Sequence, residues 1–372
     1  MIKETFMIYF LAHSDWILYN SRKEIASNLQ NFKYTVNAIT TNEKYKAGLQ
    51  HYFNDFHEWD VDRNKLIDFK GIFVLRKILK KLGSDDILHV YTLKSGLYVL
   101  FASHFQKKKY KIIISITGLG YLFSKNIISK IMRNILRIYM KYYFEIKVDV
   151  LIFQNHKDEK ILKNYLDYKK ETFLIRGSGL NLPDFSIKKN TNNSSDNELK
   201  IIMCCRLLRD KGIAEFFSLT QLFKNKKYKF YLAGNVDPGN PSSYTHEEII
   251  KLTKEHNVEY LGWINTSTEL KNFDISLCMS YHEGLPRIVL ESLYIGLYTL
   301  SNNLPGLRNI FDEYENGKLI RENNLSEFYN EIINYNDIPN LNIKSNYSRE
   351  KVANNFSTEE IVNQFLEVYR KL

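Results

Sequence analysis

The segment Tyr281–Glu291 (YHEGLPRIVLE) carries two carboxylates, Glu283 and Glu291, that lie eight positions apart across a Gly-Leu-Pro turn. The apolar run Ile275–Met279 before it predicts a short buried strand, and Arg287–Tyr294 after it has helical spacing. A strand, an acidic residue, a tight turn and a helix therefore follow one another. This order places one carboxylate before the start of a helix and the other inside it.

The start of that helix is suited to binding an anion. Pro286 has no N–H and a fixed φ, which favours the first turn of a helix. The amides that follow it would point outward at the positive end of the helix dipole, where a diphosphate fits. The residues expected around this diphosphate are Gly284, Leu285, Pro286, Arg287 and Ile288. Glu283 and Glu291 could then accept hydrogen bonds from hydroxyl groups on either side of it, one from a sugar and one from a ribose.

Two cations follow an apolar strand predicted at Lys200–Leu207 (KIIMCCRL). Arg206 stands at the end of this strand, and Lys211 opens the next helix just before Gly212. The carboxyl ends of parallel strands are where an open α/β sheet binds its ligand. A planar guanidinium and a compact ammonium suit a leaving diphosphate, although two ordinary surface cations would give the same pattern.

These motifs together resemble the retaining glycosyltransferases of the GT-B fold, specifically glycosyltransferase family 4. The resemblance rests on the E-x7-E spacing with EGLPR inside it, and on the R-L-x-x-x-K-G segment upstream. It implies that Glu283 contacts the transferred sugar and Glu291 the nucleotide ribose. It also implies that Arg206 and Lys211 bind the diphosphate, and that Glu283, Arg206 and Lys211 form the catalytic set. The family is thought to react on one face of the sugar, with the leaving phosphate helping to deprotonate the acceptor.

The resemblance implies an α/β fold of two Rossmann-like, doubly wound domains that face each other across a cleft. A length of 372 residues and alternating strands and helices agree with two such domains. We expect an acceptor-binding domain at residues 1–187 and a nucleotide-sugar-binding domain at residues 199–355. The polar run 188–198 (KKNTNNSSDNE) predicts a linker. The helix expected over residues 356–372 would pack back on the first domain, as the resemblance implies.

Two further loops of the second half match the family. A strand predicted at Val258–Leu261 ends beside Gly262, Trp263 and Ile264, which the resemblance makes candidates for contacts with the nucleotide base. Trp263 is interpreted as a packing residue in preference to a base stack. Leu304–Leu307 (LPGL) resembles the family's loop beside the donor site.

The first half predicts an α/β unit of its own. Its predicted strands are Thr5–Ala12, Tyr34–Thr40, Asp86–Tyr91, Lys111–Thr117 and Val148–Gln154. Gly118 and Gly120, in a TGLGY segment after a strand, permit close approach of the backbone to a ligand. Similar TGLGY segments occur in a branch of the family that acts on bacterial surface polysaccharides, such as O-antigen and capsule.

The first half also departs from the family. The loop at residues 12–21 (AHSDWILYNS), where many members have a Gly-rich loop, contains no glycine. Thr117 stands where many members have a histidine. The sequence alone assigns a role to none of His13, His89 and His104, because a lone histidine is more often structural than catalytic.

The positive charge is concentrated in the first half. Residues 1–180 hold 30 Lys and Arg against 17 Asp and Glu, whereas the remainder holds 22 against 25. The helix predicted at Lys125–Phe144 carries cations at helical spacing, namely Lys130, Arg133, Arg137 and Lys141. Beside them lie the aliphatic residues Ile127, Ile131, Ile135 and Leu136, and near the end of the helix lie Tyr139, Tyr142 and Tyr143. This pattern suits an anionic membrane surface, and it equally suits a core-facing helix with a solvated basic face.

Metal and thiol chemistry are not predicted. The pair Asp60-Val-Asp62 has the metal-binding spacing of other glycosyltransferases, but residues 54–59 before it do not read as a buried strand. Cys204, Cys205 and Cys278 lie in apolar strands and predict buried side chains, neither a disulfide framework nor a metal site. We expect metal-independent transfer with no tightly bound cofactor, the helix dipole and the two cations neutralising the leaving group.

The sequence therefore predicts a glycosyltransferase that moves a hexose or N-acetylhexosamine from a nucleotide-diphosphate sugar, by preference a UDP-sugar. The resemblance implies a polyprenyl-diphosphate-linked glycan as the acceptor. With no signal peptide and no membrane-spanning run evident, we expect a cytoplasmic protein attached peripherally to the inner face of the membrane. Two alternatives are a GT-B sugar-nucleotide epimerase and a basic nucleic-acid-binding protein. The acidic pair and the lack of an RNA-binding signature argue against nucleic acid as a partner.

Overall fold

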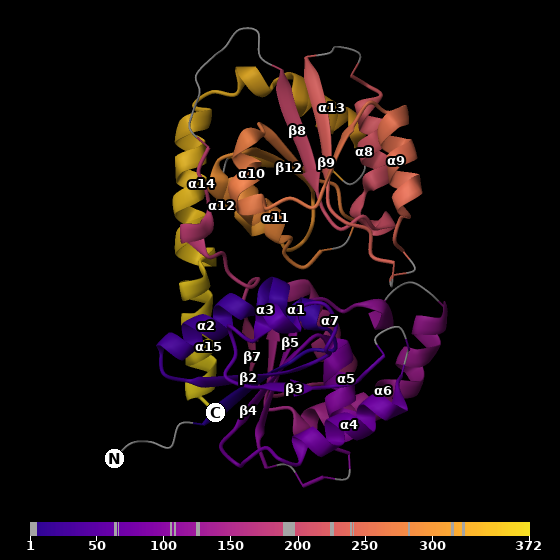
Figure 1. Ribbon diagram of the computed structural model, residues 1–372, viewed down its shortest axis with the longest axis vertical. Coiled ribbons are helices and arrows are strands. Elements are labelled where there is room, and N and C mark those ends of the chain that lie inside the picture. Colours follow the sequence, from indigo (N-terminus) through magenta and orange to yellow (C-terminus); the bar gives the residue numbers. More distant parts are fainter. Residues whose placement is uncertain are drawn as a thin grey trace. The chain divides into compact units, whose positions relative to one another are not determined.

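The computed structural model describes residues 6–62, 65, 67–104, 106–107, 109–123, 127–188, 198–223, 227–238, 240, 242–281, 283–313, 316–321 and 324–372 (Figure 1). The chain divides into two compact units. The first runs up to Gly179 and also contains Thr358–Leu372, and the second is Leu180–Ser357.

Within the described residues, the first unit is built on a seven-stranded parallel sheet in the order β3-β2-β1-β4-β5-β6-β7. Its strands are β1 (Met7–Leu11), β2 (Thr35–Thr40), β3 (Phe56–Glu58), β4 (Ile87–Tyr91), β5 (Lys111–Ile116), β6 (Val150–Phe153) and β7 (Thr172–Leu174). The central strands read as apolar runs because both faces of the sheet are covered by helices.

The helices of the first unit are α1 (Asp15–Ser21), α2 (Lys23–Asn31), α3 (Lys46–Leu49), α4 (Phe69–Leu79), α5 (Leu93–Ala102), α6 (Ile127–Lys147), α7 (His156–Leu166) and α15 (Thr358–Arg370). Successive side chains of a strand point to opposite faces. Along β5, Ile112 and Ile114 therefore join the core under α4, α5 and α6. Ile113 joins the other core, with the buried residues of α2 and α15.

The second unit holds, in its described part, a six-stranded parallel sheet in the order β10-β9-β8-β11-β12-β13. Its strands are β8 (Leu199–Cys204), β9 (Tyr228–Ala233), β10 (Glu259–Gly262), β11 (Ile275–Cys278), β12 (Tyr298–Asn302) and β13 (Gly317–Ile320). Its helices are α8 (Ile213–Thr220), α9 (His246–Glu255), α10 (Thr266–Glu269), α11 (Arg287–Ile295), α12 (Arg308–Glu313), α13 (Leu325–Ile333) and α14 (Leu341–Phe356). The predicted α/β class with two doubly wound sheets is thus confirmed.

The unit boundary lies earlier than the predicted end of the first domain at residue 187. Leu180 is buried in a core of the second unit, and Leu182 and Phe185 pack against it. This apolar packing assigns residues 180–187 to the second unit. Of the predicted linker, residues 189–197 lie outside the described residues.

The segment before Asp60 is not a buried strand, as predicted. Phe56–Glu58 forms the edge strand β3, paired in parallel with Ala38–Thr40 of β2. Its side chains are half-buried or exposed, which explains why its sequence lacks the apolar run of a central strand.

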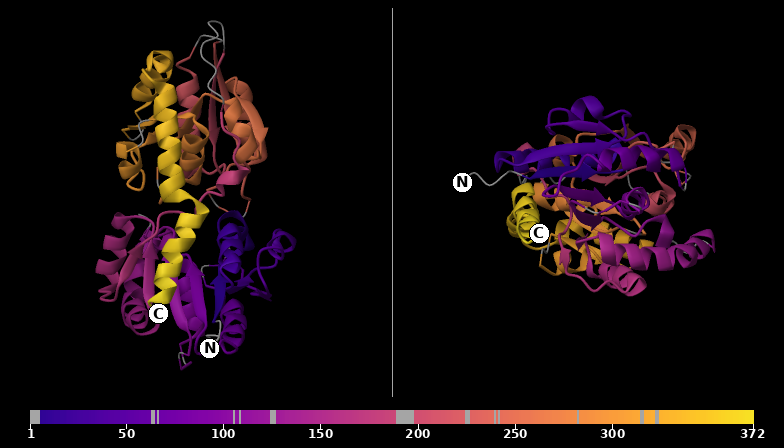
Figure 2. Two further views of the ribbon diagram at one scale, coloured as in Figure 1. Left: turned by 90° about the vertical axis from the view of Figure 1, so that its left-hand side faces the viewer. Right: turned by 90° about the horizontal axis from the view of Figure 1, so that it is seen from below.

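The C-terminal helix α15 lies against α2 of the first unit (Figure 2). Ile361, Phe365 and Tyr369 of this helix are buried in that unit. The Tyr369 hydroxyl lies 2.6 Å from Nδ1 of His89, and the Ser115 hydroxyl lies 2.7 Å from Nε2. His89 therefore joins β4 to β5 and to the end of the chain.

The burial of His89 predicts that the free energy of unfolding falls in acid. Burial, with the nearby cation of Arg22 adding to it, lowers the pKa of His89 well below its ordinary value of 6.5. The folded state therefore keeps His89 neutral while the unfolded chain takes up a proton, so stability is complete above pH 6.5 and falls as the pH drops further. We expect a loss of at most about 1.4 kcal/mol per pH unit from this group. The free energy of unfolding, measured by urea denaturation of the natural protein and of His89→Gln between pH 7.5 and 5, gives this loss.

The His89→Gln variant should show a flatter pH dependence, whatever its stability at pH 7.5. The matched control is His51→Gln, an exposed histidine of the same unit, which should keep the slope of the natural protein. Equal slopes for the natural protein and His89→Gln would contradict the assignment.

Candidate functional site

The loop after β8 and the loop after β11 approach each other closely. Gly212 has φ 78°, and a Cβ there would lie 2.2 Å from the Met279 carbonyl oxygen, so only glycine fits. The Tyr281 amide donates to the Asp210 carbonyl over 3.1 Å. These contacts hold Lys211 next to the acidic segment that begins after β11.

Lys211 and Glu283 form the central ion pair of this site. The Lys211 ammonium donates to Oε1 of Glu283 over 2.5 Å, and the carboxylate of Asp210 lies 3.8 Å from the same nitrogen. The Lys211 side chain is 8 % exposed and that of Glu283 is 27 % exposed. An ion pair this well shielded is screened less by solvent than a surface pair, so it fixes both side chains.

The Gly284–Pro286 turn packs against the loop that follows β12. A Cβ on Gly306 would lie 1.6 Å from the Gly284 carbonyl oxygen. Pro286 precedes the helix instead of forming its first turn, because its ψ of 116° is extended. The helix α11 begins at Arg287, and the first amides of a helix have no acceptor one turn earlier in the helix. Ile288, the second residue of α11, packs its side chain against the cores beneath the helix.

Glu291 lies one turn inside α11 and is 5 % exposed. Its Oε1 accepts a hydrogen bond from Nε of Arg287 over 2.7 Å. Arg287 and Glu291 thus form an ion pair at the start of the helix. A ribose hydroxyl could use the second oxygen of this carboxylate.

Arg206 is at the carboxyl end of β8 and is about half exposed. Its guanidinium Nη1 lies 3.7 Å from Oδ2 of Asp237, which follows β9. Asp237 was not among the predicted site residues, since its position beside Arg206 depends on the pairing of β8 with β9. This ion pair orients Arg206 at the same sheet edge as Lys211.

The base-contact candidates lie at the end of β10. The Gly262 carbonyl accepts a hydrogen bond from the Gly234 amide over 2.7 Å, and Ile264 is buried. Trp263 is 71 % exposed, so the interpretation of Trp263 as a packing residue of its unit is wrong. The left-handed turn at Gly262, with φ 65°, coincides with a shift in strand register at this edge of the sheet.

Asn302 is a structural residue of the site that the sequence analysis missed. It is buried at the end of β12, and its side-chain amide donates to the carbonyls of Met279 and Ser280. These bonds fix the chain as it leaves β11 toward Glu283. The sequence does place a polar residue, Asn302, at the end of a mostly apolar strand, and this pattern could have indicated a structural role.

The sheet order explains why these loops meet. From β8 the chain builds outward through β9 to β10, then returns to place β11 on the other side of β8. The crevice at such a reversal, outside the carboxyl ends of the strands, is where open α/β sheets bind ligands. Arg206, Lys211 and Glu283 all follow the ends of β8 or β11. Gly262 to Ile264 lie at the end of the edge strand β10.

Gly118 and Gly120 are in the first unit, in the loop after β5. Both have positive φ, 153° and 60°, and a Cβ on either would meet no atom within 4 Å. The open space around both glycines permits a ligand to approach the backbone.

The first sheet reverses its order between β1 and β4, and His13 lies there. Its Nδ1 is 2.9 Å from the Ser95 hydroxyl and 3.2 Å from the Thr92 hydroxyl. Thr92 has φ 81°, a strained conformation for a β-branched residue. His89 is buried, and the ring of His104 stacks on Tyr139 of α6 and contacts Tyr143. Of the three histidines that the sequence left open, His13 is the one at the ligand-binding edge.

The thiols and the Asp60-Val-Asp62 pair have other partners. Burial raises the pKa of the Cys204 thiol to about 12, with Glu291 adding to the effect, and burial also raises the pKa of Cys278. Burial therefore favours the protonated form of both thiols at neutral pH. Asp60 pairs with Lys70 over 2.6 Å, and Asp62 lies 3.8 Å from Lys65. Among the described residues, no group of three or more His, Cys, Asp or Glu is placed to hold a metal ion.

The α6 helix presents an apolar stripe to solvent. Its exposed members are Ile127, Ile131, Ile135, Ile138, Tyr142 and Ile146, and Ile138 is 82 % exposed. The isoleucines named in the sequence analysis therefore do not face the core, whereas Met140 and Phe144 of the same helix are buried in it. Through the described part of the chain, no helix is long and apolar enough to cross a membrane.

Two family models match the chain. The model described as Glycosyl transferases group 1 matches residues 184–351, and the model described as Glycosyl transferase 4-like matches residues 7–155. The first covers the ion-paired site of the second unit, and the second covers most of the first unit.

Curated relatives match over most of their length. N,N'-diacetylbacillosaminyl-diphospho-undecaprenol α-1,3-N-acetylgalactosaminyltransferase of Campylobacter jejuni is 25% identical over 98% of both chains. UDP-Gal:α-D-GlcNAc-diphosphoundecaprenol α-1,3-galactosyltransferase of Escherichia coli is 24% identical over 81% of this chain and 79% of that one.

Solved structures share the fold. Sucrose-phosphate synthase of Thermosynechococcus elongatus superposes with a TM-score of 0.78 at 17% identity, covering 98% of each chain. Anabaena HepE in complex with UDP and glucose gives 0.75 at 14% identity, covering 99% of this chain and all of that one. These similarities confirm the predicted fold of two Rossmann-like domains.

Proposed function

This chain belongs to glycosyltransferase family 4, and we propose that it is a retaining transferase that moves a hexose or N-acetylhexosamine from a UDP-sugar to a lipid-linked glycan. The observation that carries the proposal is the pairing of Lys211 with Glu283 beside the start of α11. It joins a diphosphate-binding cation and a sugar-binding carboxylate at one point of the sheet edge.

The proposed reaction breaks the bond between the anomeric carbon and the β-phosphate oxygen. The acceptor oxygen bonds to the same face of that carbon, and its proton passes to the leaving phosphate. Arg206, Lys211 and the first amides of α11 stabilise the charge that develops on the diphosphate. Glu283 holds the sugar hydroxyls and Glu291 the ribose, so no protein nucleophile is required.

The choice of UDP and of the acceptor is supported by the relatives. The Escherichia coli relative is named for a UDP-galactose donor, and HepE was crystallised with UDP. Both curated relatives are named for glycans on diphospho-undecaprenol. We propose the same acceptor class here, within O-antigen or capsule synthesis, with the polar groups around His13 facing it. Transfer without a metal ion follows from the cations that already serve the diphosphate.

An anionic membrane surface is the proposed location of this reaction, on the cytoplasmic side. The exposed isoleucines of α6 would enter the lipid interface, and cations on the same helix would meet anionic headgroups. Each such cation contributes on the order of 1 kcal/mol near a charged surface. Peripheral attachment would bring the first unit to its lipid-linked acceptor.

Nucleotide binding tests the donor site. In the presence of EDTA, UDP should raise the melting temperature of the natural protein, and GDP and ADP should raise it less. Glu291→Ala should abolish the rise, because it removes the ribose acceptor. Glu269→Ala on α10, an exposed carboxylate of the same unit, is the control. A rise that requires added Mn²⁺ would refute the metal-independent site, and no rise with any nucleotide would refute the donor site.

Turnover tests the role of Glu283. Loss of a charged hydrogen bond costs about 1.5–3 kcal/mol, so Glu283→Ala should lower kcat about tenfold or more. Release of UDP from the UDP-sugar, with and without a diphospholipid acceptor, is the measurement. Glu259→Ala, an exposed carboxylate on β10, should keep the natural rate. An unchanged kcat in Glu283→Ala would remove this residue from the mechanism.

Vesicle binding tests the membrane surface. Ile135→Ser/Ile138→Ser should weaken binding to phosphatidylglycerol vesicles about tenfold or more, since two apolar side chains no longer enter the interface. Co-sedimentation measures this, with neutral phosphatidylcholine vesicles for comparison. Ile250→Ser on α9, which removes an isoleucine that is 46 % exposed, should bind as the natural protein does. Equal binding by the double variant would contradict the proposed surface.

A further inference from the structure

Three cations at the carboxyl edge of the second sheet each have a carboxylate partner. The pairs are Arg206 with Asp237, Lys211 with Glu283 and Asp210, and Arg287 with Glu291. Carboxylates therefore outnumber cations in this group of side chains, which carries no net positive charge before a ligand binds. A nucleoside diphosphate is itself a polyanion, so carboxylates at this edge must do something other than attract it.

Asp237 is a carboxylate of this edge to which the proposed reaction gives no role. Glu283 and Glu291 have hydroxyl groups of the donor to accept from, whereas Asp237 faces a diphosphate-binding cation. Its Oδ2 lies 3.7 Å from Nη1 of Arg206, which is an ion pair but too long for a hydrogen bond between these two atoms. The Asp237 side chain is 27 % exposed and that of Arg206 is 46 % exposed, so a ligand can reach the pair from solvent.

The loop after β9 holds Asp237 in this place. Gly234 has φ 139°, and a Cβ there would lie 1.8 Å from the Cys205 carbonyl oxygen, so only glycine lets the loop approach the end of β8. Further along the loop, the Asp237 amide donates to the Ser243 hydroxyl over 2.8 Å. Backbone contacts, and not the ion pair alone, therefore keep Asp237 beside Arg206.

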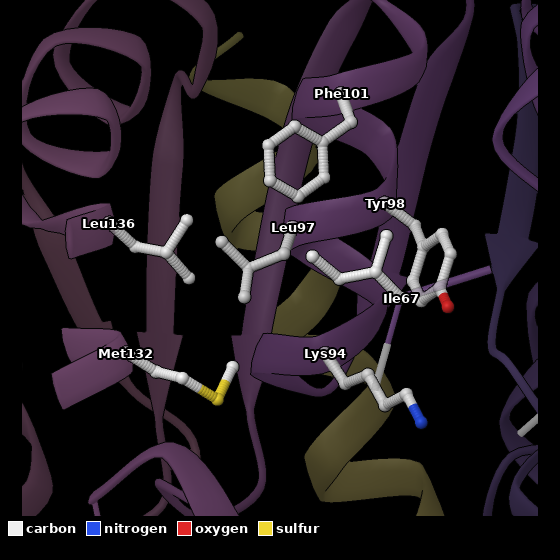
Figure 3. A pocket seen from close by; sticks show the side chains of 7 residues that line it. All are labelled: Ile67, Lys94, Leu97, Tyr98, Phe101, Met132 and Leu136. Atoms are coloured by element: carbon white, nitrogen blue, oxygen red, sulfur yellow. The ribbon is translucent and has the colours of Figure 1, made fainter. Parts of the chain in front are cut away.

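Lys94 of the first unit has a hydrogen-bond acceptor of another kind. It lines a small, mostly apolar space between α5 and α6 (Figure 3), and its ammonium donates to the Lys65 carbonyl over 3.0 Å. A neutral carbonyl accepts a hydrogen bond without cancelling the charge of the ammonium. Lys211 and Arg287 donate to carboxylates instead, so at the edge of the second sheet the same contacts also offset the positive charge.

The donor and the product of the proposed reaction differ in charge at the diphosphate. In a nucleotide sugar both phosphates are diesters, and each carries a single negative charge. After transfer the terminal phosphate of the released nucleoside diphosphate is a monoester. The second pKa of a phosphate monoester is about 6, so at neutral pH the product carries additional negative charge. A carboxylate beside a diphosphate-binding cation therefore repels the product more than the donor.

We propose that Asp237 discriminates between donor and product, because it lowers the affinity of the site for the free nucleoside diphosphate more than for the nucleotide sugar. The inference rests on the proposed function for its ligand and adds the step of product release, which limits turnover in many enzymes. The same repulsion acts more weakly on the leaving phosphate in the transition state, where only part of the extra charge has developed. Lys211 and the first amides of α11 also bind that phosphate.

Calorimetric titration of the whole protein with two probes tests the proposal. The probes are UDP and its β-methyl ester, a diester that lacks the extra charge of the product whatever sugar the donor carries. In Asp237→Asn the Kd for UDP should fall about threefold, and the Kd for the methyl ester should fall by less than about twofold. Glu255→Gln, at an exposed carboxylate of α9, removes the same charge from the same unit and should leave both constants unchanged. An unaltered thermal transition shows that each variant is folded.

The two members of the ion pair should have opposite effects on UDP binding. Arg206→Gln should raise the Kd for UDP about tenfold, because a charged hydrogen bond to the diphosphate is lost. A pair that served only to orient Arg206 would weaken binding on the loss of either partner. Weaker or unchanged binding of UDP by Asp237→Asn would therefore overturn the proposal, and so would equal tightening for both probes. Failure of the natural protein to bind UDP would instead overturn the donor site, on which this inference rests.

Discussion

The rest of the donor site depends on the ion pair between Lys211 and Glu283, because this pair fixes the distance between two loops. One loop follows β8 and the other follows β11, and the two residues are 72 positions apart in the chain. The pair forms because Gly212 lets the backbone come against the Met279 carbonyl, where any Cβ would collide. Asn302 secures the same strand end from β12. The segment from Met279 to Glu283 is thus held by an ion pair, by the close approach of Gly212 and by the buried amide of Asn302.

Parallel sheets explain why the chemistry gathers at edges in both units. All strands of such a sheet end on the same side, and the reversal of strand order leaves a crevice there. In the second unit this edge collects cations, carboxylates and the start of α11. In the first it collects His13, Thr92 and the start of α5 with Lys94. The two units share an architecture but present different chemistry: ion pairs suited to a diphosphate sugar in one, and the polar side chains of His13 and Thr92 with the Lys94 cation in the other.

The α6 helix exposes an apolar stripe in the first unit, which we propose to meet a lipid environment. It has apolar residues on its solvent side as well as on its core side, which an ordinary surface helix does not. A large exposed apolar stripe is costly unless something covers it. The cations on the helix favour an anionic bilayer as that cover.

The sequence by itself determined the class of fold, the family and the local chemistry, because these depend on short-range patterns. The spacing of Glu283 and Glu291, the apolar strands and the helical periodicity of α6 are all readable within about twenty residues. Tertiary structure alone decided the pairing of Lys211 with Glu283 and of Arg206 with Asp237, because each joins segments that only the sheet order brings together. It also decided that Trp263 and the isoleucines of α6 are exposed and that residues 180–187 belong to the second unit. Burial is a property of the packed molecule, and a residue's type predicts its exposure only on average.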